Sequence, residues 1–221
     1  MTMLLGMRTL ALLTCVFCLL GARSAATAEP TAPTWTRFEF QQVEMAVPIR
    51  IVLYAAEAAT AEQAAQAAFA RIHQLNGVFS DYDETSELRR LCETAGLGKR
   101  VRVSDELWRV LMKAQEIAEK SAGAFDVTCG PVVQLWRRAR RMKALPAAER
   151  LQAARPLVGY RLVRLDPPGQ AVELLKPDMR LDLGGIAKGY VVQDALRVLR
   201  EHGAPAAMVD AGSGGTRKRS P

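Results

Sequence analysis

Hydrophobic and polar positions alternate in some stretches of the chain, and this pattern predicts strands. Alternation over 36–43 and 49–54 predicts two strands, and the break around Met45 and Pro48 lets them form a hairpin. Shorter alternating or apolar stretches predict five more strands, over 101–103, 161–165, 171–175, 179–183 and 206–210. Most of these strands follow one another closely, which favours antiparallel pairing.

Other stretches repeat their apolar residues every three to four positions, and this period predicts helices. An Ala-rich helix is expected from Thr60 to about Asn76, with Thr60 and Gln63 forming a capping box. Ser86 and Ser104 are expected to cap the next two helices. Three further helices are predicted from Pro131, within 145–156 and up to His202. Because hairpins and helices mix without steady β-α-β alternation, the expected fold is α+β, a mostly antiparallel sheet flanked by helices.

The helix predicted from Pro131 carries its charge at one end. Its apolar residues are expected to face the core: Val132, Val133, Leu135 and Trp136. Its last turns are basic: Arg137, Arg138, Arg140, Arg141 and Lys143. Cations stabilise a helix C-terminus. We therefore interpret this basic run as a solvated helix face rather than as an anion site.

Residues 1–28 have the pattern of a secretory signal peptide. Arg8 precedes an apolar run over 10–20, and Ala26 to Ala28 form a small-residue cleavage site. The apolar run is short for a transmembrane helix. Its cysteine at position 15 fits a lipoprotein cleavage box only loosely, so secretion is expected and anchoring in the inner membrane is the alternative. Residues 29–35 then form a linker, and the mature chain is expected in the periplasm or another extracytoplasmic space.

The formal net charge of +7 comes mostly from the two ends of the chain. Five of the 30 basic residues are Arg8 and Arg23 at the start and Arg217, Lys218 and Arg219 at the end. Without these five, 25 basic residues stand against 23 acidic ones. There is also no interleaving of aromatic and basic residues of the kind that stacks on bases. Nucleic acid is therefore not an expected partner.

The cysteines and histidines of the mature chain indicate no metal motif. Cys92 and Cys129 are expected to be free, half-buried thiols, although an oxidising compartment would allow them to pair. The histidines, His73 and His202, fall in helical patterns without a partner. A histidine-based triad or metal site is therefore not expected.

The stretch LDLGGIAKGY, residues 181–190, contains the densest group of candidate functional residues. Asp182 ends a predicted strand, Gly184 and Gly185 form a turn, and Lys188 opens a predicted helix. Helix N-termini present free amides to anions. The glycine spacing matches neither common phosphate-loop motif. These residues alone are therefore consistent with either a simple tight turn or a site for an anion or a metal.

Three motifs together resemble the ApbE family, the FAD:protein FMN transferases. They are FSDY at 79–82 with SEL at 86–88, then GAFDVT at 123–128 with GP and LW behind it, then DLGGIAKGY at 182–190. The motifs occur in the family's order and spacing, and the resemblance extends from about residue 40 to 214.

The resemblance implies a magnesium-dependent enzyme that moves FMN from FAD onto a Thr or Ser hydroxyl of an extracytoplasmic flavoprotein and releases AMP. The implied acceptor is a flavin-carrying subunit of a membrane redox complex. Two alternatives stay open: an FAD pyrophosphatase, and a protein that binds FAD without catalysis.

Residue by residue, the resemblance implies seven FAD-contacting positions: Met45, Tyr82, Ala124, Phe125, Asp126, Asp182 and Lys188. It implies that the backbone carbonyl of Gly185 helps to hold Mg²⁺. It assigns no catalytic side chain. A thioether and an aromatic ring suit a flat ring system, and a backbone oxygen suits magnesium.

The sequence departs from the family pattern in three places. Cys92 stands where the family has Asn, and Ala46 and Val47 stand where it has Gly-Thr. After Gly214, residues 215–221 do not continue the pattern, and the later segment with the remaining magnesium ligands does not follow. We therefore expect a C-terminally truncated domain over 36–214 with an incomplete magnesium site, poor solubility and little activity.

Overall fold

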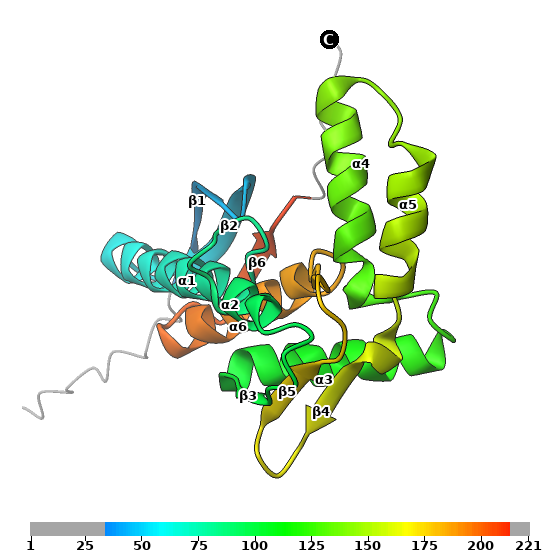
Figure 1. Cartoon of the computed structure of the whole chain (residues 1–221). Helices are drawn as coiled ribbons and strands as arrows, with labels where there is room; N and C mark the ends of the chain where they lie inside the picture. Colours follow the sequence, from blue (N-terminus) through cyan, green and yellow to red (C-terminus); the bar gives the residue numbers. More distant parts are fainter. Residues whose placement is uncertain (1–33, 213–221) are drawn as a thin grey trace, which may run out of the picture. The chain divides into compact units, whose positions relative to one another are not determined.

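The computed structural model describes residues 34–212, which form two antiparallel sheets with helices packed against them (Figure 1). The predicted α+β class and the antiparallel pairing are confirmed, but there are two three-stranded sheets where one was expected. The predicted signal peptide, most of the linker and the tail at 215–221 lie outside the described residues. No helix within the described part is long and apolar enough to cross a membrane.

The first sheet has the strand order β1-β2-β6. Strands β1 (Thr36–Glu44) and β2 (Val47–Ala55) form the predicted hairpin, and β6 (Ala206–Asp210) pairs with the other edge of β2. The side chains of β2 alternate for most of its length, so Ile49, Ile51 and Leu53 point into the core.

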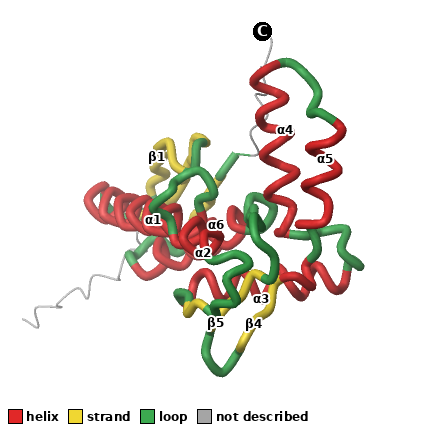
Figure 2. The backbone as a smooth tube through the Cα atoms, in the orientation of Figure 1, coloured by secondary structure: helices red, strands yellow, loops and turns green. Residues whose placement is uncertain are grey.

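Helices α1 (Ala58–Phe79) and α6 (Ala187–Glu201) lie side by side against this sheet (Figure 2). Arg71 of α1 joins three helices, since its guanidinium donates to Asp194 of α6 at 2.6 Å and to Glu106 of α3 (Asp105–Lys120) at 2.8 Å. The predicted capping box is wrong. Helix α1 starts at Ala58, so Thr60 and Gln63 lie inside it, because the alanines before Thr60 are strong helix formers.

The second sheet has the order β3-β5-β4, from strands β3 (Val101–Arg102), β4 (Val163–Asp166) and β5 (Ala171–Leu174). Helices α2 (Glu87–Glu93) and α3 (Asp105–Lys120) begin after Ser86 and Ser104, the two predicted caps. The remaining elements are η1 (Val127–Cys129), α4 (Gly130–Met142), α5 (Ala148–Ala154), η2 (Arg155–Leu157) and η3 (Tyr160–Leu162).

Residues 179–183 do not form the predicted strand. Met179, Leu181 and Leu183 are buried in alternation, which explains the strand-like pattern. The backbone amides bond elsewhere, because Leu181 N–H donates to Cys92 Sγ at 3.3 Å and Asp182 N–H donates to the Val127 carbonyl at 2.8 Å. The segment is therefore an extended wall held by α2 and η1, and not a member of either sheet.

The apolar side of α4 does not face the core as predicted. Trp136 is 49% exposed, and Gly130 is the buried residue of the helix. Helix α4 packs on α5 and η2, which carry few large apolar residues of their own. The apolar positions of α4 are therefore half covered by a short helix instead of fully buried by a sheet.

The Ser104 cap of α3 leads to a stability prediction. Ser104 Oγ accepts the Leu107 N–H at 3.3 Å, and Ser104 donates through both N–H and Oγ to the Glu87 carboxylate at 2.6 Å. Ser104→Ala is expected to lower the free energy of unfolding by about 1 kcal/mol, the usual cost of losing an N-cap. Urea denaturation measures the difference. Ser104→Thr keeps the hydroxyl and is the control; equal losses in both variants would contradict a capping role.

Candidate functional site

A cavity of about 720 Å³ opens where the β1–β2 turn, the end of α1, helix α4 and the start of α6 meet. Three of the residues predicted from the family resemblance line it: Met45, Tyr82 and Lys188. They come from positions far apart in the sequence. The fold therefore brings the first and third motifs, and the β1–β2 turn, to one place.

Met45 occupies the two-residue turn between β1 and β2, because Glu44 pairs directly with Val47. Both turn residues have left-handed backbones, with φ of 53° at Met45 and 60° at Ala46. Such positive angles are typical of tight hairpin turns, where glycine or asparagine is usual. The turn carries the thioether of Met45 to the cavity wall.

Tyr82 belongs to a loop that is fixed by its own polar groups. Ser80 Oγ accepts the backbone N–H groups of Tyr82 and Asp83 at 3.3 and 3.1 Å, and Ser86 Oγ donates to the Ser80 carbonyl at 2.5 Å. At the end of α1, Phe79 packs edge-on against Tyr190 of α6 with ring centroids 5.5 Å apart. The Tyr82 side chain is left 70% exposed at the cavity, so its ring is available for stacking.

Like Arg140, Arg137 of α4 is a cavity-lining residue that the sequence interpretation missed. Its guanidinium lies 4.5 Å from the centroid of the Tyr82 ring and donates to Asp81 and, at 2.8 Å, to Asp182. The three side chains are only 28%, 15% and 10% exposed for Arg137, Asp81 and Asp182. Interpreting Arg137 as part of a solvated face was therefore wrong, although Arg138, Arg140, Arg141 and Lys143 are exposed as expected.

Within this triad, the Arg137 guanidinium pairs directly with both carboxylates. Burial alone would lower the pKa of Arg137, but the hydrogen bond and the charge of Asp81, together with the charge of Asp182, raise it above its ordinary value. No local sequence signal singled out Arg137, because only the fold shows that Asp81 and Asp182 are withdrawn from water and therefore require a cation.

The 181–190 stretch is both a tight turn and a cavity wall. Asp182 Oδ1 accepts the Gly184 N–H at 2.8 Å and so closes the turn before α6. Lys188 lies in the first turn of α6, and its Nζ lies 3.5 Å from the Gly212 carbonyl oxygen. The free amides at the start of α6 add positive potential at the same wall.

The 124–126 segment supports the site from behind rather than lining the cavity. A Cβ atom at Gly185 would lie 3.1 Å from Cε2 of Phe125, so this ring packs directly against the glycine turn. Asp126 Oδ1 accepts the N–H and the Oγ1–H of Thr128 at 2.8 and 2.6 Å. Ala124 is exposed beside them. The Phe125 ring and the Val127 carbonyl, which accepts the Asp182 N–H at 2.8 Å, hold the 181–190 stretch in place.

Cys92, the departure from the family's Asn, has a defined partner. Its buried Sγ accepts the Leu181 N–H at 3.3 Å, one residue before Asp182. Burial raises the pKa of this thiol, so the sulfur stays neutral. The substitution keeps an acceptor for the backbone that leads into the site. Cys92 and Cys129 are both free, as expected.

The lining chemistry suits an anionic ligand with a flat ring. Arg140 and Lys188 supply positive charge, whereas Arg137 is already paired with Asp81 and Asp182. Tyr82 and Met45 supply apolar, polarisable contacts. Magnesium fits less well. Residues 34–212 contain no group of three or more His, Cys, Asp or Glu side chains placed to hold a metal, and Asp182 is already paired with Arg137. The Gly185 backbone oxygen alone does not make a complete site.

Comparison with known proteins agrees with this geometry. The sequence profile of the ApbE family matches residues 45–217. The FAD:protein FMN transferase of Haemophilus influenzae is 31% identical over 158 residues, which is 70% of this chain and 46% of that protein. The FAD:protein FMN transferase of Treponema pallidum is 31% identical over 182 residues, 79% of this chain and 50% of that protein. The chain spans about half the length of these relatives.

Solved structures show the same fold. The flavin transferase ApbE of Vibrio cholerae superposes with a TM-score of 0.73 at 24% identity, covering 81% of this chain and 58% of that one. The ApbE protein of Thermotoga maritima gives a TM-score of 0.70 at 27% identity, covering 80% and 57%. With the profile matched over more than half of its length, the chain belongs to the ApbE family.

Proposed function

We propose that the chain acts in FAD:protein FMN transfer, with FAD as donor, Mg²⁺ as cofactor and AMP as product. The observation that carries this proposal is the cavity in which Met45, Tyr82, Arg140 and Lys188 converge. Its volume of about 720 Å³ lies within the range of roughly 300–1,000 Å³ that is usual for small-molecule and cofactor sites.

In this proposal two parts of FAD, the isoalloxazine ring and the pyrophosphate, meet matching surfaces. The isoalloxazine ring stacks on Tyr82 and contacts Met45, since both offer polarisable apolar faces. The pyrophosphate lies toward Lys188, Arg140 and the amides at the start of α6, where the positive potential is concentrated. Asp182 and Phe125 keep the glycine turn in position beneath it.

The proposed transfer breaks a phosphoanhydride bond and forms a phosphoester bond. The hydroxyl oxygen of an acceptor Thr or Ser forms a bond to the phosphorus on the flavin side, and the bond between the two phosphates of FAD breaks. AMP leaves with the bridging oxygen, and the hydroxyl proton is released. Magnesium, when bound, neutralises charge on the phosphates. Residues 34–212 contribute at most the Gly185 carbonyl to its shell, so no step is assigned to the ion here.

The proposed setting is extracytoplasmic, and in a bacterium with two membranes it is the periplasm. The signal-peptide pattern of residues 1–28 supports this placement. We propose as acceptor a flavin-carrying subunit of a membrane redox complex. The chain would then meet the membrane through this acceptor, and its own N-terminus could associate with the membrane as well. The names of the matched relatives support a protein acceptor for FMN.

The deciding experiment incubates the chain with FAD, Mg²⁺ and a purified acceptor flavoprotein. Because residues 34–212 supply only the Gly185 carbonyl toward magnesium, slow transfer is the expected result: flavin fluorescence that stays with the acceptor in a denaturing gel, with one AMP per flavin. Free FMN and AMP in equal amounts would instead identify an FAD pyrophosphatase. Saturable FAD binding without AMP release would identify a non-catalytic FAD-binding protein.

Lys188→Ala is expected to weaken FAD binding about tenfold. One charge-assisted hydrogen bond contributes about 1.5 kcal/mol, which corresponds to that factor. Titration of FAD followed by flavin fluorescence measures it. Lys188→Arg keeps the charge and is expected to recover part of the affinity. Lys120→Ala, on the exposed end of α3, is the matched control, and an equal loss there would refute a local role for Lys188.

A further inference from the structure

Helices α4 and α5 form a hairpin that extends away from the two sheets (Figures 1 and 2). The two helices pack against each other, and their buried residues, Gly130 and Ala154, both lie at the base. Helix α4 ends at Met142, and the next residue, Lys143, turns the chain sharply with a φ of 51°. The tip, residues 143–147, is therefore held in place by its own hairpin and is not covered by the rest of the described chain.

The hairpin is strongly basic toward its tip. Five exposed cations belong to it: Arg138, Arg140, Arg141, Lys143 and Arg150. Glu149 is the single carboxylate between positions 130 and 157 of the sequence. Among residues 34–212, no carboxylate lies within 4 Å of any of the five cations, whereas eight of the other fifteen arginines in this range are paired with one.

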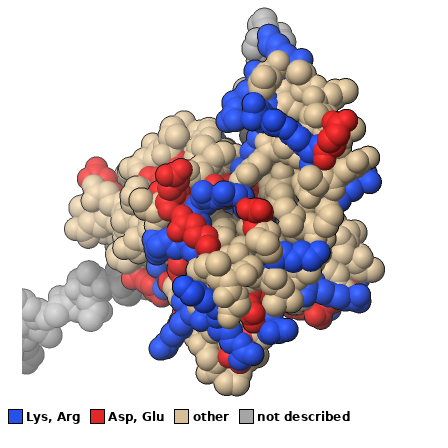
Figure 3. Space-filling view, in the orientation of Figure 1, with Lys and Arg blue, Asp and Glu red and all other residues tan. Residues whose placement is uncertain are grey.

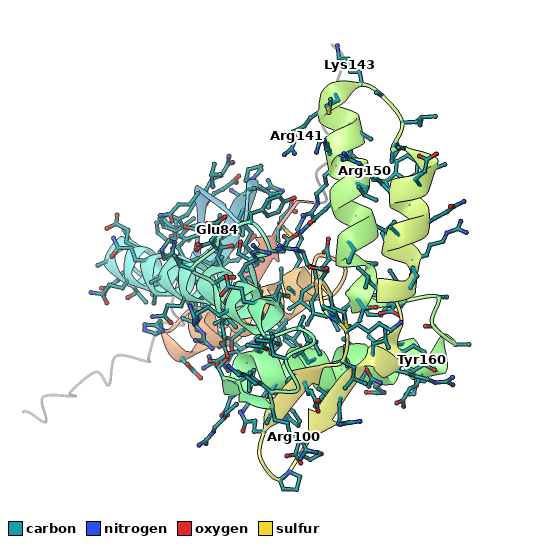
Figure 4. The ribbon with its side chains drawn as sticks, viewed as in Figure 1. Glu84, Arg100, Arg141, Lys143, Arg150 and Tyr160 are labelled. Atoms are coloured by element: carbon teal, nitrogen blue, oxygen red, sulfur yellow. The ribbon has the colours of Figure 1, made fainter. Side chains whose placement is uncertain are left out.

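The figures show how these charges are arranged. In the space-filling view, basic side chains gather over the α4–α5 hairpin with little acidic surface among them (Figure 3). Lys143 lies at the very tip, with Arg141 and Arg150 just below it (Figure 4). Several cations close together without counter-charges repel one another, so this surface favours an extended anionic partner.

Two large apolar side chains accompany the cations. Met142 is 62% exposed and Leu145 is 84% exposed, and both lie at or beside the tip. A soluble polyanion would bind the cations but leave these two side chains in water. A lipid surface would contact the cations and the apolar side chains alike, because apolar side chains enter the boundary between headgroups and acyl chains while long basic side chains stay at headgroup level.

We propose that the tip of the α4–α5 hairpin docks on an anionic bilayer surface, with Leu145 and Met142 inserted among the headgroups. Arg140 belongs both to the hairpin and to the cavity lining, so docking would hold the cavity close to the membrane. The inference does not depend on which reaction the cavity performs. It is also separate from any anchoring by the first residues of the chain.

The test uses the full chain and vesicles of phosphatidylethanolamine with phosphatidylglycerol, compared with vesicles of phosphatidylcholine alone. The hairpin variant carries Arg138→Gln, Arg141→Gln, Lys143→Gln and Arg150→Gln, and leaves Arg137 and Arg140 of the cavity unchanged. Because each basic residue near an anionic surface contributes appreciably to binding, the variant is expected to partition on the order of 100-fold more weakly. Raising the salt from about 0.1 M to about 1 M should reduce wild-type binding in the same direction.

A matched control removes the same charge elsewhere, through Lys99→Gln, Arg102→Gln, Arg109→Gln and Lys113→Gln, all exposed positions. It is expected to bind like the wild type. The first 33 residues are common to all three proteins, so differences among them report the hairpin. Equal losses in both variants, or no loss in the hairpin variant, would overturn the proposal and leave an acidic protein as the partner of this surface.

A local readout separates docking of the tip from general adsorption. In a Leu145→Trp variant, the emission of the new indole is expected to shift to the blue on anionic vesicles. Brominated lipids should quench it more strongly than they quench the wild-type tryptophans. An indole at position 145 that stays water-exposed while the protein sediments with the vesicles would also overturn the proposal.

Discussion

Replacing Arg137 with alanine is expected to lower the free energy of unfolding by about 2–3 kcal/mol. The guanidinium joins Asp81 and Asp182, whose side chains are largely withdrawn from water, and it covers one face of Tyr82. Without it, two carboxylates face each other without a counter-charge. Removing one partner of a fully buried ion pair costs about 3–5 kcal/mol, and the partial exposure of Arg137 places the expected loss somewhat lower.

Urea denaturation in the absence of ligand measures this effect. Arg138→Ala is the matched control, because the next residue along α4 is exposed and pairs with no carboxylate of the described chain; its free energy should change by less than about 0.5 kcal/mol. Arg137→Lys keeps one charge but loses the two-pronged geometry, so an intermediate loss is expected.

A double-mutant cycle makes the interpretation specific. Combining Arg137→Ala with Asp182→Asn should cost less than the sum of the two single changes, with a coupling of roughly 0.5–3 kcal/mol. Strict additivity would mean that Arg137 stabilises the fold through Tyr82 or Asp81 and not through Asp182.

Gly130→Ala is expected to destabilise the protein by about 3 kcal/mol and to weaken FAD binding at the same time. A Cβ atom at position 130 would lie 2.5 Å from the carbonyl oxygen of Arg180 and 2.8 Å from its carbonyl carbon. These are backbone atoms, so α4 and the 179–183 segment must separate. Overpacking of this kind typically costs about 1–3 kcal/mol.

The link to binding follows from what this contact positions. Asp182 comes two residues after Arg180, and Arg137 lies two turns along α4 from Gly130, so separating the two elements pulls the Arg137–Asp182 pair apart. Thermal or urea unfolding and an FAD titration measure the two effects. Gly77→Ala is the control, because a Cβ there meets nothing within 4 Å; it should stabilise helix α1 by about 0.5–1 kcal/mol. A Gly130→Ala protein with wild-type stability would contradict the close approach.

Local signals in the sequence predicted most elements. Ser86 and Ser104 cap α2 and α3 as expected, because a cap depends on a hydroxyl and a backbone amide three residues away. The β1–β2 hairpin follows from alternation and a short turn. The alternation at 179–183 predicted a strand that does not form. Every second side chain there is buried, but such burial does not require pairing with a neighbouring strand.

The site was predictable in part. The family resemblance predicted positions such as Met45, Tyr82 and Lys188, and the fold places these three on one cavity. Phe125 and Asp126 came from the same resemblance, but they act behind the glycine turn. Nothing in the local sequence distinguishes a residue that lines a cavity from one that supports its wall.

The sequence by itself determined the α+β class, the two capped helices, the hairpin and the membership in the ApbE family, because these depend on short-range periodicity, caps and motifs. Only the tertiary structure decided that Arg137 leaves the basic run of α4 to pair with Asp81 and Asp182, which are 56 and 45 residues away. The physical reason is that carboxylates shielded from water require a nearby cation, and only the packing of α4 beside two distant loops decides which arginine supplies it.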